Sequence, residues 1–143
     1  MQMSAELAEP LVLAEAPLGA RRILYAKGGS FSGPGLRGEL LPGGGDWVLE
    51  RRDGIAELDI RFVLRSEDGA LIHVRCAGLF GAAPEVRQRL RAKEEVDPAE
   101  YYFRTAAFFE TGAERYRRLN CLVAVGVGQR TRTGMVTEVF ELK

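Results

Sequence analysis

Histidine and cysteine, which supply many of the metal ligands in proteins, are scarce in this sequence. It contains one histidine, His73, and two cysteines, Cys76 and Cys121, which do not form a Cys-x-x-Cys pair. A site built from several histidines of one chain is therefore excluded, and no zinc-ligand or calcium-loop spacing is present. Because each cysteine lies in its own apolar run, two buried thiols are favoured over a disulfide or redox pair. We expect neither a metal nor any other cofactor.

A surplus of one charge and a long hydrophobic run are also missing. Lysine and arginine together number 20, as do aspartate and glutamate, so the chain lacks the excess positive charge that sequence-independent nucleic-acid binding needs. No apolar run reaches the length of a membrane span. The first ten residues, MQMSAELAEP, are acidic and lack the apolar core of a secretory signal. We therefore expect a cytoplasmic protein that binds neither nucleic acid nor membrane.

Short apolar segments separated by turn residues make up most of the chain. Pro-Gly-Gly-Gly, two Asp-Gly pairs and Thr-Gly stand between them, and such residues favour tight turns between strands. A chain of 143 residues suits one domain. The pattern predicts an all-β fold, a closed antiparallel β-barrel of about eight to ten strands with one short helix, or a sandwich. A barrel is favoured because its closure removes exposed strand edges. Residues 83–94 are the expected helix, 1–10 a flexible tail, and the expected strands are 11–16, 21–27, 36–41, 47–51, 55–65, 70–78, 101–111, 119–130 and 134–142.

The two Asp-Gly turns predict a strand register. If 52–54 and 67–69 each form a three-residue loop with a left-handed glycine, Leu49 opposes Glu57 and Arg61 opposes Arg75. One sheet face is then apolar, with Leu58, Ile60, Phe62, Leu64, Ile72, Val74 and Cys76. The other is mixed, with Trp47, Leu49, Glu57, Asp59, Arg61, Val63, His73 and Arg75. A slip of one residue in either turn would exchange the faces.

The mixed face has two interpretations. It is either a solvated surface with scattered charges or the lining of a ligand pocket, in which Trp47 is an apolar wall. In the pocket interpretation the candidate catalytic residues are Glu57, Asp59 and His73, with Glu57 the better base, and Arg61 and Arg75 bind ligand. If this face lines the barrel, the apolar face points outward and needs cover from another subunit, most simply in a homodimer.

Two further segments add candidate ligand-binding residues. Strand alternation places Tyr102 and Arg104 on one face, where they could polarise a ligand carbonyl, although an aromatic core with a surface arginine is equally compatible with the pattern. The glycine-rich stretch GGSFSGPGLRGELLPGGGDW, residues 28–47, allows close backbone approach. It could deliver side chains to a barrel mouth, namely Arg37, Glu39, Asp46 and Trp47.

Several long motifs give the chain a family resemblance. GGSFSGPGLRGELLPGGGDW, DGIAELDIRFVLRSEDGALIHVRCAG and EYYFRTAAFFETGAERYRRLN, followed by VGVGQR, occur in order. Together they resemble a bacterial and fungal family, domain of unknown function 3237, over nearly the whole chain after Leu11. The resemblance implies an antiparallel β-barrel, in agreement with the strand pattern, and implies no particular reaction.

Two functional classes follow from these features. The first is a small-molecule-binding barrel that acts as a cofactor-free acid–base enzyme, an isomerase, cyclase or lyase for a small hydrophobic or aromatic metabolite. The second is a non-catalytic barrel that binds a metabolite or has a structural role in an oligomer. Neutralising a single carboxylate distinguishes them, because an enzyme would lose turnover while a binder has none to lose.

Overall fold

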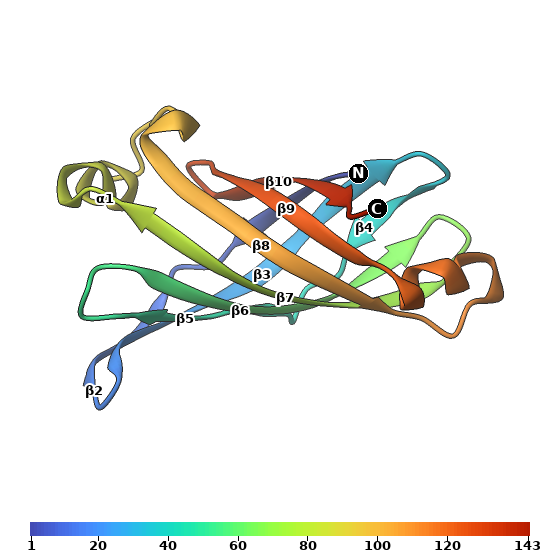
Figure 1. Cartoon of the computed structure of the whole chain (residues 1–143), viewed down its shortest axis with the longest axis horizontal. Coiled ribbons are helices and arrows are strands. Elements are labelled where there is room, and N and C mark those ends of the chain that lie inside the picture. Colours follow the sequence, from blue (N-terminus) through green and yellow to red (C-terminus); the bar gives the residue numbers. More distant parts are fainter.

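Antiparallel strands form a closed barrel along the length of the chain (Figure 1). The structure is a computed structural model and describes residues 1–143. The first half contains β1 (Gln2–Leu7), β2 (Leu11–Ala16), β3 (Gly19–Gly33), β4 (Leu36–Leu40), β5 (Gly45–Glu50) and β6 (Ala56–Ser66). The second half contains β7 (Leu71–Ala82), α1 (Pro84–Arg91), the 3-10 helix η1 (Pro98–Glu100), β8 (Tyr101–Glu110), the 3-10 helix η2 (Glu114–Cys121), β9 (Val123–Arg130) and β10 (Gly134–Glu141).

Closure depends on β1, which pairs with β10 on one side and with β3 on the other. The remaining neighbours follow the order β10-β9-β8-β7-β6. One place in the barrel wall, between β6 and β3, is occupied by two short strands. Strand β4 pairs with one part of both neighbours, and β5 pairs with another part of both. The barrel therefore has eight strand positions, and β2 is an extra strand that pairs only with β3. The predicted closed antiparallel barrel is confirmed.

The register predicted from the Asp-Gly turns is also confirmed. Leu49 pairs with Glu57, and Arg61 pairs with Arg75. Gly54 and Gly69 have φ values of 86° and 84°, the left-handed conformation that a three-residue loop needs at its glycine. Two short-range turns thus set the alignment of three strands.

The apolar face of β6 and β7 points into the barrel. Leu64, Ile72 and Val74 are fully buried, and they belong to a single core cluster that also includes Phe103 and Phe109 of β8. Burial of apolar surface is the main favourable term in folding, so the continuous apolar face fills the interior. Strand alternation then turns the mixed face outward.

The segment expected to be a flexible tail is structured instead. Gln2–Leu7 form β1, and Met3 is buried in the core. The expected strand over 21–27 is also longer, because β3 continues through the glycines to Gly33. In both places the partner strand, and not the local composition, determines the extended conformation.

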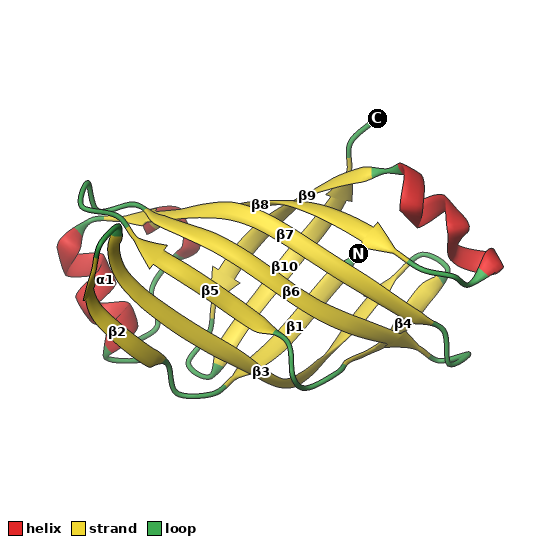
Figure 2. Ribbon diagram, turned by 90° about the horizontal axis from the view of Figure 1, so that it is seen from below, coloured by secondary structure: helices red, strands yellow, loops and turns green.

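The helices lie at opposite ends of the barrel (Figure 2). Helix α1 begins at Pro84, whose fixed φ suits the first helical turn, and buries Val86 against the core. It confirms the helix expected over 83–94. The second end carries η2. No helix of the protein combines the length and apolar character needed to cross a bilayer.

The β2–β3 hairpin extends away from the barrel wall (lower left in Figure 1). Leu11, Val12 and Leu13 are each more than half exposed, at 53%, 61% and 51%. Both faces of β2 are therefore accessible. The homodimer expected from the sequence stays a prediction.

Candidate functional site

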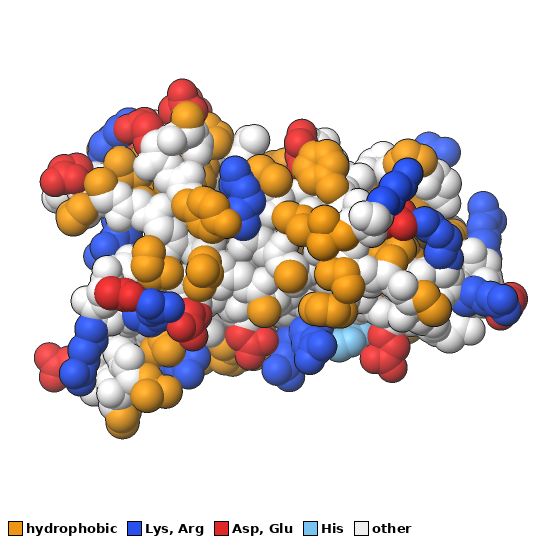
Figure 3. Space-filling view, in the orientation of Figure 1, with side chains coloured by type: hydrophobic (Ala, Val, Ile, Leu, Met, Phe, Trp, Pro, Cys, Tyr) orange, Lys and Arg blue, Asp and Glu red, His pale blue; other side chains and the backbone are white.

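The residues predicted to share a cavity lie on the outer surface of the barrel. Glu57, Asp59, Arg61, His73, Arg75 and Tyr102 are exposed, and Trp47 and Arg104 are partly buried. The single histidine is visible at the surface beside basic and acidic side chains (Figure 3). The predicted convergence on one cavity is wrong, because the apolar face fills the interior and alternation directs these side chains to solvent.

These outer side chains pair locally and do not form one constellation. Glu57 accepts from Arg51 at 3.2 Å, and His73 Nδ1 lies 3.9 Å from a Glu110 carboxylate oxygen. The guanidiniums of Arg75 and Arg104 lie 5.2 Å from the ring centroids of Phe108 and Tyr102. Trp47 packs edge-on against Tyr25. The two remaining candidates, Arg37 and Glu39, lie on β4. They form exposed ion pairs, Arg37 with Glu67 and Glu39 with Arg65.

Because Asp59 is solvent-exposed, its removal should have little effect on folding. Its carboxylate lies 3.4 Å from Arg61, and both side chains are more than half exposed. We expect Asp59→Ala to change the free energy of unfolding by about 0–1 kcal/mol, the range for surface ion pairs. Urea denaturation of the two proteins measures the difference. A loss of several kcal/mol would show that the Asp59 carboxylate is buried in solution.

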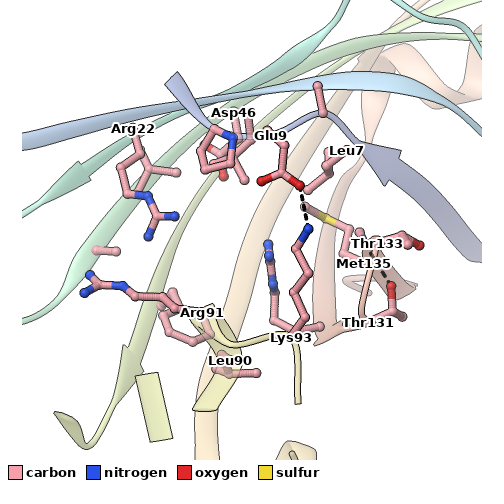
Figure 4. A pocket seen from close by; sticks show the side chains of 18 of the residues that line it. Leu7, Glu9, Arg22, Asp46, Leu90, Arg91, Lys93, Thr131, Thr133 and Met135 are labelled. Atoms are coloured by element: carbon pink, nitrogen blue, oxygen red, sulfur yellow. Dashed lines mark hydrogen bonds and ion pairs between the residues drawn. The ribbon is translucent and has the colours of Figure 1, made fainter. Parts of the chain in front are cut away.

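A cavity opens inside the barrel at the end covered by α1. Its volume is about 310 Å³, at the small end of the range for ligand pockets. Figure 4 shows side chains entering it from the barrel wall and from the segment around α1. The wall is apolar at Leu24, Val48, Leu58, Phe80, Phe103 and Met135, and polar at Arg22, Asp46 and Arg130.

Asp46 is the buried acid of this cavity. Asp46 is only 4% exposed, and its Oδ1 accepts a hydrogen bond from the Asp59 backbone N–H at 3.1 Å. The second oxygen, Oδ2, has no partner in the chain, and no cation lies within ion-pair distance. Burial raises the pKa of Asp46 from 3.8 to about 7, although the Asp59 N–H and the charge of Arg130 act in the opposite direction.

Arg130 is a basic residue of the cavity whose side chain has no ion-pair partner. Its backbone N–H donates to the Tyr101 hydroxyl at 2.9 Å, but its guanidinium makes no hydrogen bond and no ion pair. Burial, together with the nearby charge of Arg22, lowers the pKa of Arg130. The five guanidinium N–H groups are thus available to a guest in the cavity.

Arg22 connects the barrel wall to α1 through a carboxylate. Glu50 lies 3.2 Å from Nη1 of Arg22 and 3.2 Å from Nη2 of Arg91, which belongs to α1. Figure 4 shows the Arg22 and Arg91 side chains extending into the same space. The Nε of Arg22 is buried and has no hydrogen-bond partner.

Asp46 also borders a second, smaller cavity deeper in the barrel. This cavity has a volume of about 40 Å³ and is mostly apolar, with Cys76 in its wall. Burial, and then the charge of Asp46, raises the pKa of the Cys76 thiol to about 12, so the thiol is not a nucleophile near neutral pH. No three side chains among His, Cys, Asp and Glu come together as they would to hold a metal ion.

The sequence contained a signal for these interior polar residues. Arg22 and Asp46 share their strand parity with buried Leu24 and Val48, and a charge in register with a core face indicates an interior site. Asp46 was expected at a barrel mouth, and the structure places it in the interior cavity. The parity of Arg130 is harder to recognise because its interior neighbours on β9 include Gly128, which packs against the Phe103 ring.

Comparisons with known proteins place the whole chain among uncharacterised relatives. The family described as "Protein of unknown function (DUF3237)" matches residues 1–142. A UPF0311 protein of Rhodopseudomonas palustris is 32% identical over 140 residues, covering 98% of this chain and 92% of its own. The crystal structure of a conserved protein of unknown function from R. palustris has a TM-score of 0.94 at 31% identity, with 98% and 92% coverage. A structure described as an enzyme from Penicillium herquei has a TM-score of 0.70 at 19% identity, with 99% and 90% coverage, a likeness of fold alone.

Proposed function

Because the chain belongs to the DUF3237 family, whose description assigns no reaction, we propose a function from the interior cavity. The barrel binds a small hydrophobic or aromatic metabolite and acts on it as a cofactor-free acid–base enzyme, an isomerase, cyclase or lyase. Asp46 transfers the proton. The observation that carries this proposal is the buried Asp46 carboxyl, with one oxygen unpaired, at the wall of the cavity.

The environment of Asp46 suits a general acid–base. A pKa of about 7 means that the carboxyl and the carboxylate are both populated near neutral pH, where proton transfer is most effective. The Asp59 N–H holds Oδ1, which fixes the orientation of the group and leaves Oδ2 for the substrate. Strongly perturbed acids in cavities are frequent at catalytic sites.

The apolar wall favours a substrate with a flat or branched hydrocarbon body. Phe80 and Phe103 lie edge to face with centroids 5.9 Å apart, and both line the cavity. A ring that packs against them excludes water from Asp46, and this keeps the carboxylate basic. The related fold described as an enzyme from Penicillium herquei supports catalysis by analogy of architecture.

The proposal is tested by proton exchange at carbon. A panel of small aromatic ketones and phenolic enones is incubated with the protein in D₂O, and NMR follows exchange next to the carbonyl and any cyclised product. We expect activity on a panel member that rises with pH through about 7 as Asp46 ionises, and falls at least about 100-fold in Asp46→Asn.

Asp59→Asn is the matched control, since it neutralises a neighbouring but exposed carboxylate and keeps the backbone N–H that holds Asp46. Its turnover should stay close to that of the unchanged protein, because the charge of Asp59 has the smallest of the effects on the pKa of Asp46. Equal turnover in Asp46→Asn and the unchanged protein would remove Asp46 from the reaction. A panel compound that binds without any conversion would favour a non-catalytic metabolite-binding barrel.

A further inference from the structure

The cavity is strongly basic in a chain that is neutral overall. Its lining contains seven lysine and arginine side chains against three aspartates and glutamates, whereas the whole chain has 20 of each kind. The surplus is concentrated where the substrate of the proposed function would bind. Such a lining raises the local concentration of anions.

Four of the seven basic side chains form ion pairs, whereas Lys27, Arg87 and Arg130 form none. Lys93 pairs with Glu9 across the mouth, as the dashed line in Figure 4 shows, and Arg132 pairs with Glu95 at 3.7 Å. Arg22 shares Glu50 with Arg91. Arg130 has no carboxylate within ion-pair distance.

Arg130 and Arg22 form an incomplete anion site. The two guanidiniums are close enough that the charge of Arg22 disfavours the protonated form of Arg130. The Nε of Arg22 is buried without a partner. Glu50 compensates the charge of Arg22, but no carboxylate compensates that of Arg130, and an unpaired charge in a poorly hydrated cavity is unfavourable. The nearest buried acid, Asp46, is not within ion-pair distance of Arg130.

We propose that the substrate carries a carboxylate, which the Arg130 guanidinium binds beside Arg22, while its apolar body packs against Phe80 and Phe103. The planar fork of a guanidinium matches a carboxylate through two parallel N–H···O bonds. This inference rests on the proposed function for the identity of the site and adds the substrate class, a small aromatic or hydrophobic carboxylic acid.

A bound carboxylate would also interact with the proton of Asp46. The groups that act on Asp46 are Arg130 from β9 and Asp59 from β6, and Cys76 from β7 shares its smaller cavity. A further negative charge would favour the protonated carboxyl, so substrate binding and proton uptake are linked. The carboxylate should therefore bind more weakly as the pH rises through about 7.

Isothermal titration calorimetry with matched probes tests the site. The probes are benzoate, cinnamate and 2-naphthoate, each compared with its neutral amide. At pH 6 we expect at least one acid to bind at least tenfold more tightly than its amide. Arg130→Gln should remove this preference and leave amide binding unchanged, while Arg130→Lys, which keeps the charge and loses the fork, should restore part of it.

Arg117→Gln is the matched control, because Arg117 is an exposed arginine of η2 that does not line the cavity. It should bind the acid as the unchanged protein does, and thermal unfolding verifies that each variant is folded. In Asp46→Asn the acid should bind with nearly the same affinity at pH 6 and pH 8, because the titrating neighbour is gone.

The proposal is overturned if no acid binds more tightly than its amide, or if Arg130→Gln binds the acid as well as the unchanged protein does. These readouts are heats of binding and need no turnover. The acid site therefore survives if Asp46 proves non-catalytic, and catalysis by Asp46 survives if the acid preference is absent.

Discussion

Asp46→Asn is expected to be more stable than the unchanged protein by about 4 kcal/mol at pH 8 without ligand. Burial raises the pKa of this carboxyl from 3.8 to about 7, and each tenfold change in acidity corresponds to about 1.4 kcal/mol. Asparagine has nearly the same shape and can still accept from the Asp59 N–H. It lacks the charge whose burial opposes folding.

The pH dependence has a definite sign. Between pH 3.8 and about 7 the folded protein keeps the Asp46 proton while the unfolded chain has lost it, so the contribution of Asp46 to stability falls as pH rises. Above about 7 both states are ionised and the penalty is constant. Urea denaturation at pH 4.5, 6 and 8 should therefore show the advantage of Asp46→Asn growing across the series.

Asp59→Asn provides the comparison, because its carboxylate is more than half exposed, and it should not reproduce this trend. If Asp46→Asn and the unchanged protein are equally stable at pH 8, the carboxylate is hydrated or paired in solution. If Asp46→Asn is more stable than the unchanged protein but loses turnover, Asp46 is a residue that serves function at a cost in stability.

Gly29→Ala is expected to destabilise the fold by about 3 kcal/mol or more. Gly29 pairs with Ala5 of β1, and a Cβ at this position would lie 1.9 Å from the Ser4 carbonyl oxygen. Backbone cannot move aside as a flexible side chain can. The strand would have to shift toward β10, where a Cβ on Gly134 would lie only 1.8 Å from the Ala5 carbonyl oxygen, so the approach is equally close there. Forced overpacking typically costs about 1–3 kcal/mol, and more where nothing can relax.

Gly112→Ala is the control for this change. A Cβ there meets no atom within 4 Å, and Gly112 is exposed, so its free energy of unfolding should stay within about 0.5 kcal/mol of the unchanged protein. Chemical denaturation compares both variants. If Gly29→Ala is as stable as Gly112→Ala, the closing strands lie farther apart than these contacts require.

The sequence predicted the architecture where local signals determine it. The Asp-Gly turns set the register of β5, β6 and β7 because a turn with a left-handed glycine aligns its flanking strands directly. The sequence alone could not show which face of these strands is interior. The same alternation is consistent with a polar-lined pocket and with an apolar core. Burial of apolar surface decides between them, because the apolar face packs in the interior against side chains from strands farther along the chain, such as Phe103 and Phe109 of β8.

The interior site was harder to predict for a related reason. Arg22, Asp46 and Arg130 lie on β3, β5 and β9, and only the closed barrel brings them to one cavity. Glu57 and Asp59 were more conspicuous because they cluster in the sequence, although clustering along one outer strand reflects solvent exposure. β1 was missed because its segment is short and polar, and its strand conformation depends on pairing with β10.

The pairing of β1 with β10 also determines when the barrel can be completed. The Met1 amino group donates to the Val139 carbonyl, 138 residues along the chain, and the Val139 N–H donates back to the Met1 carbonyl. During synthesis on the ribosome, β1 can pair early with β3 but its other edge stays open until β10 has emerged. Closure is therefore a late, long-range step of the kind that slows folding. The nascent chain carries an unpaired strand edge, a target for chaperones or for aggregation, until almost all of this sequence has been translated.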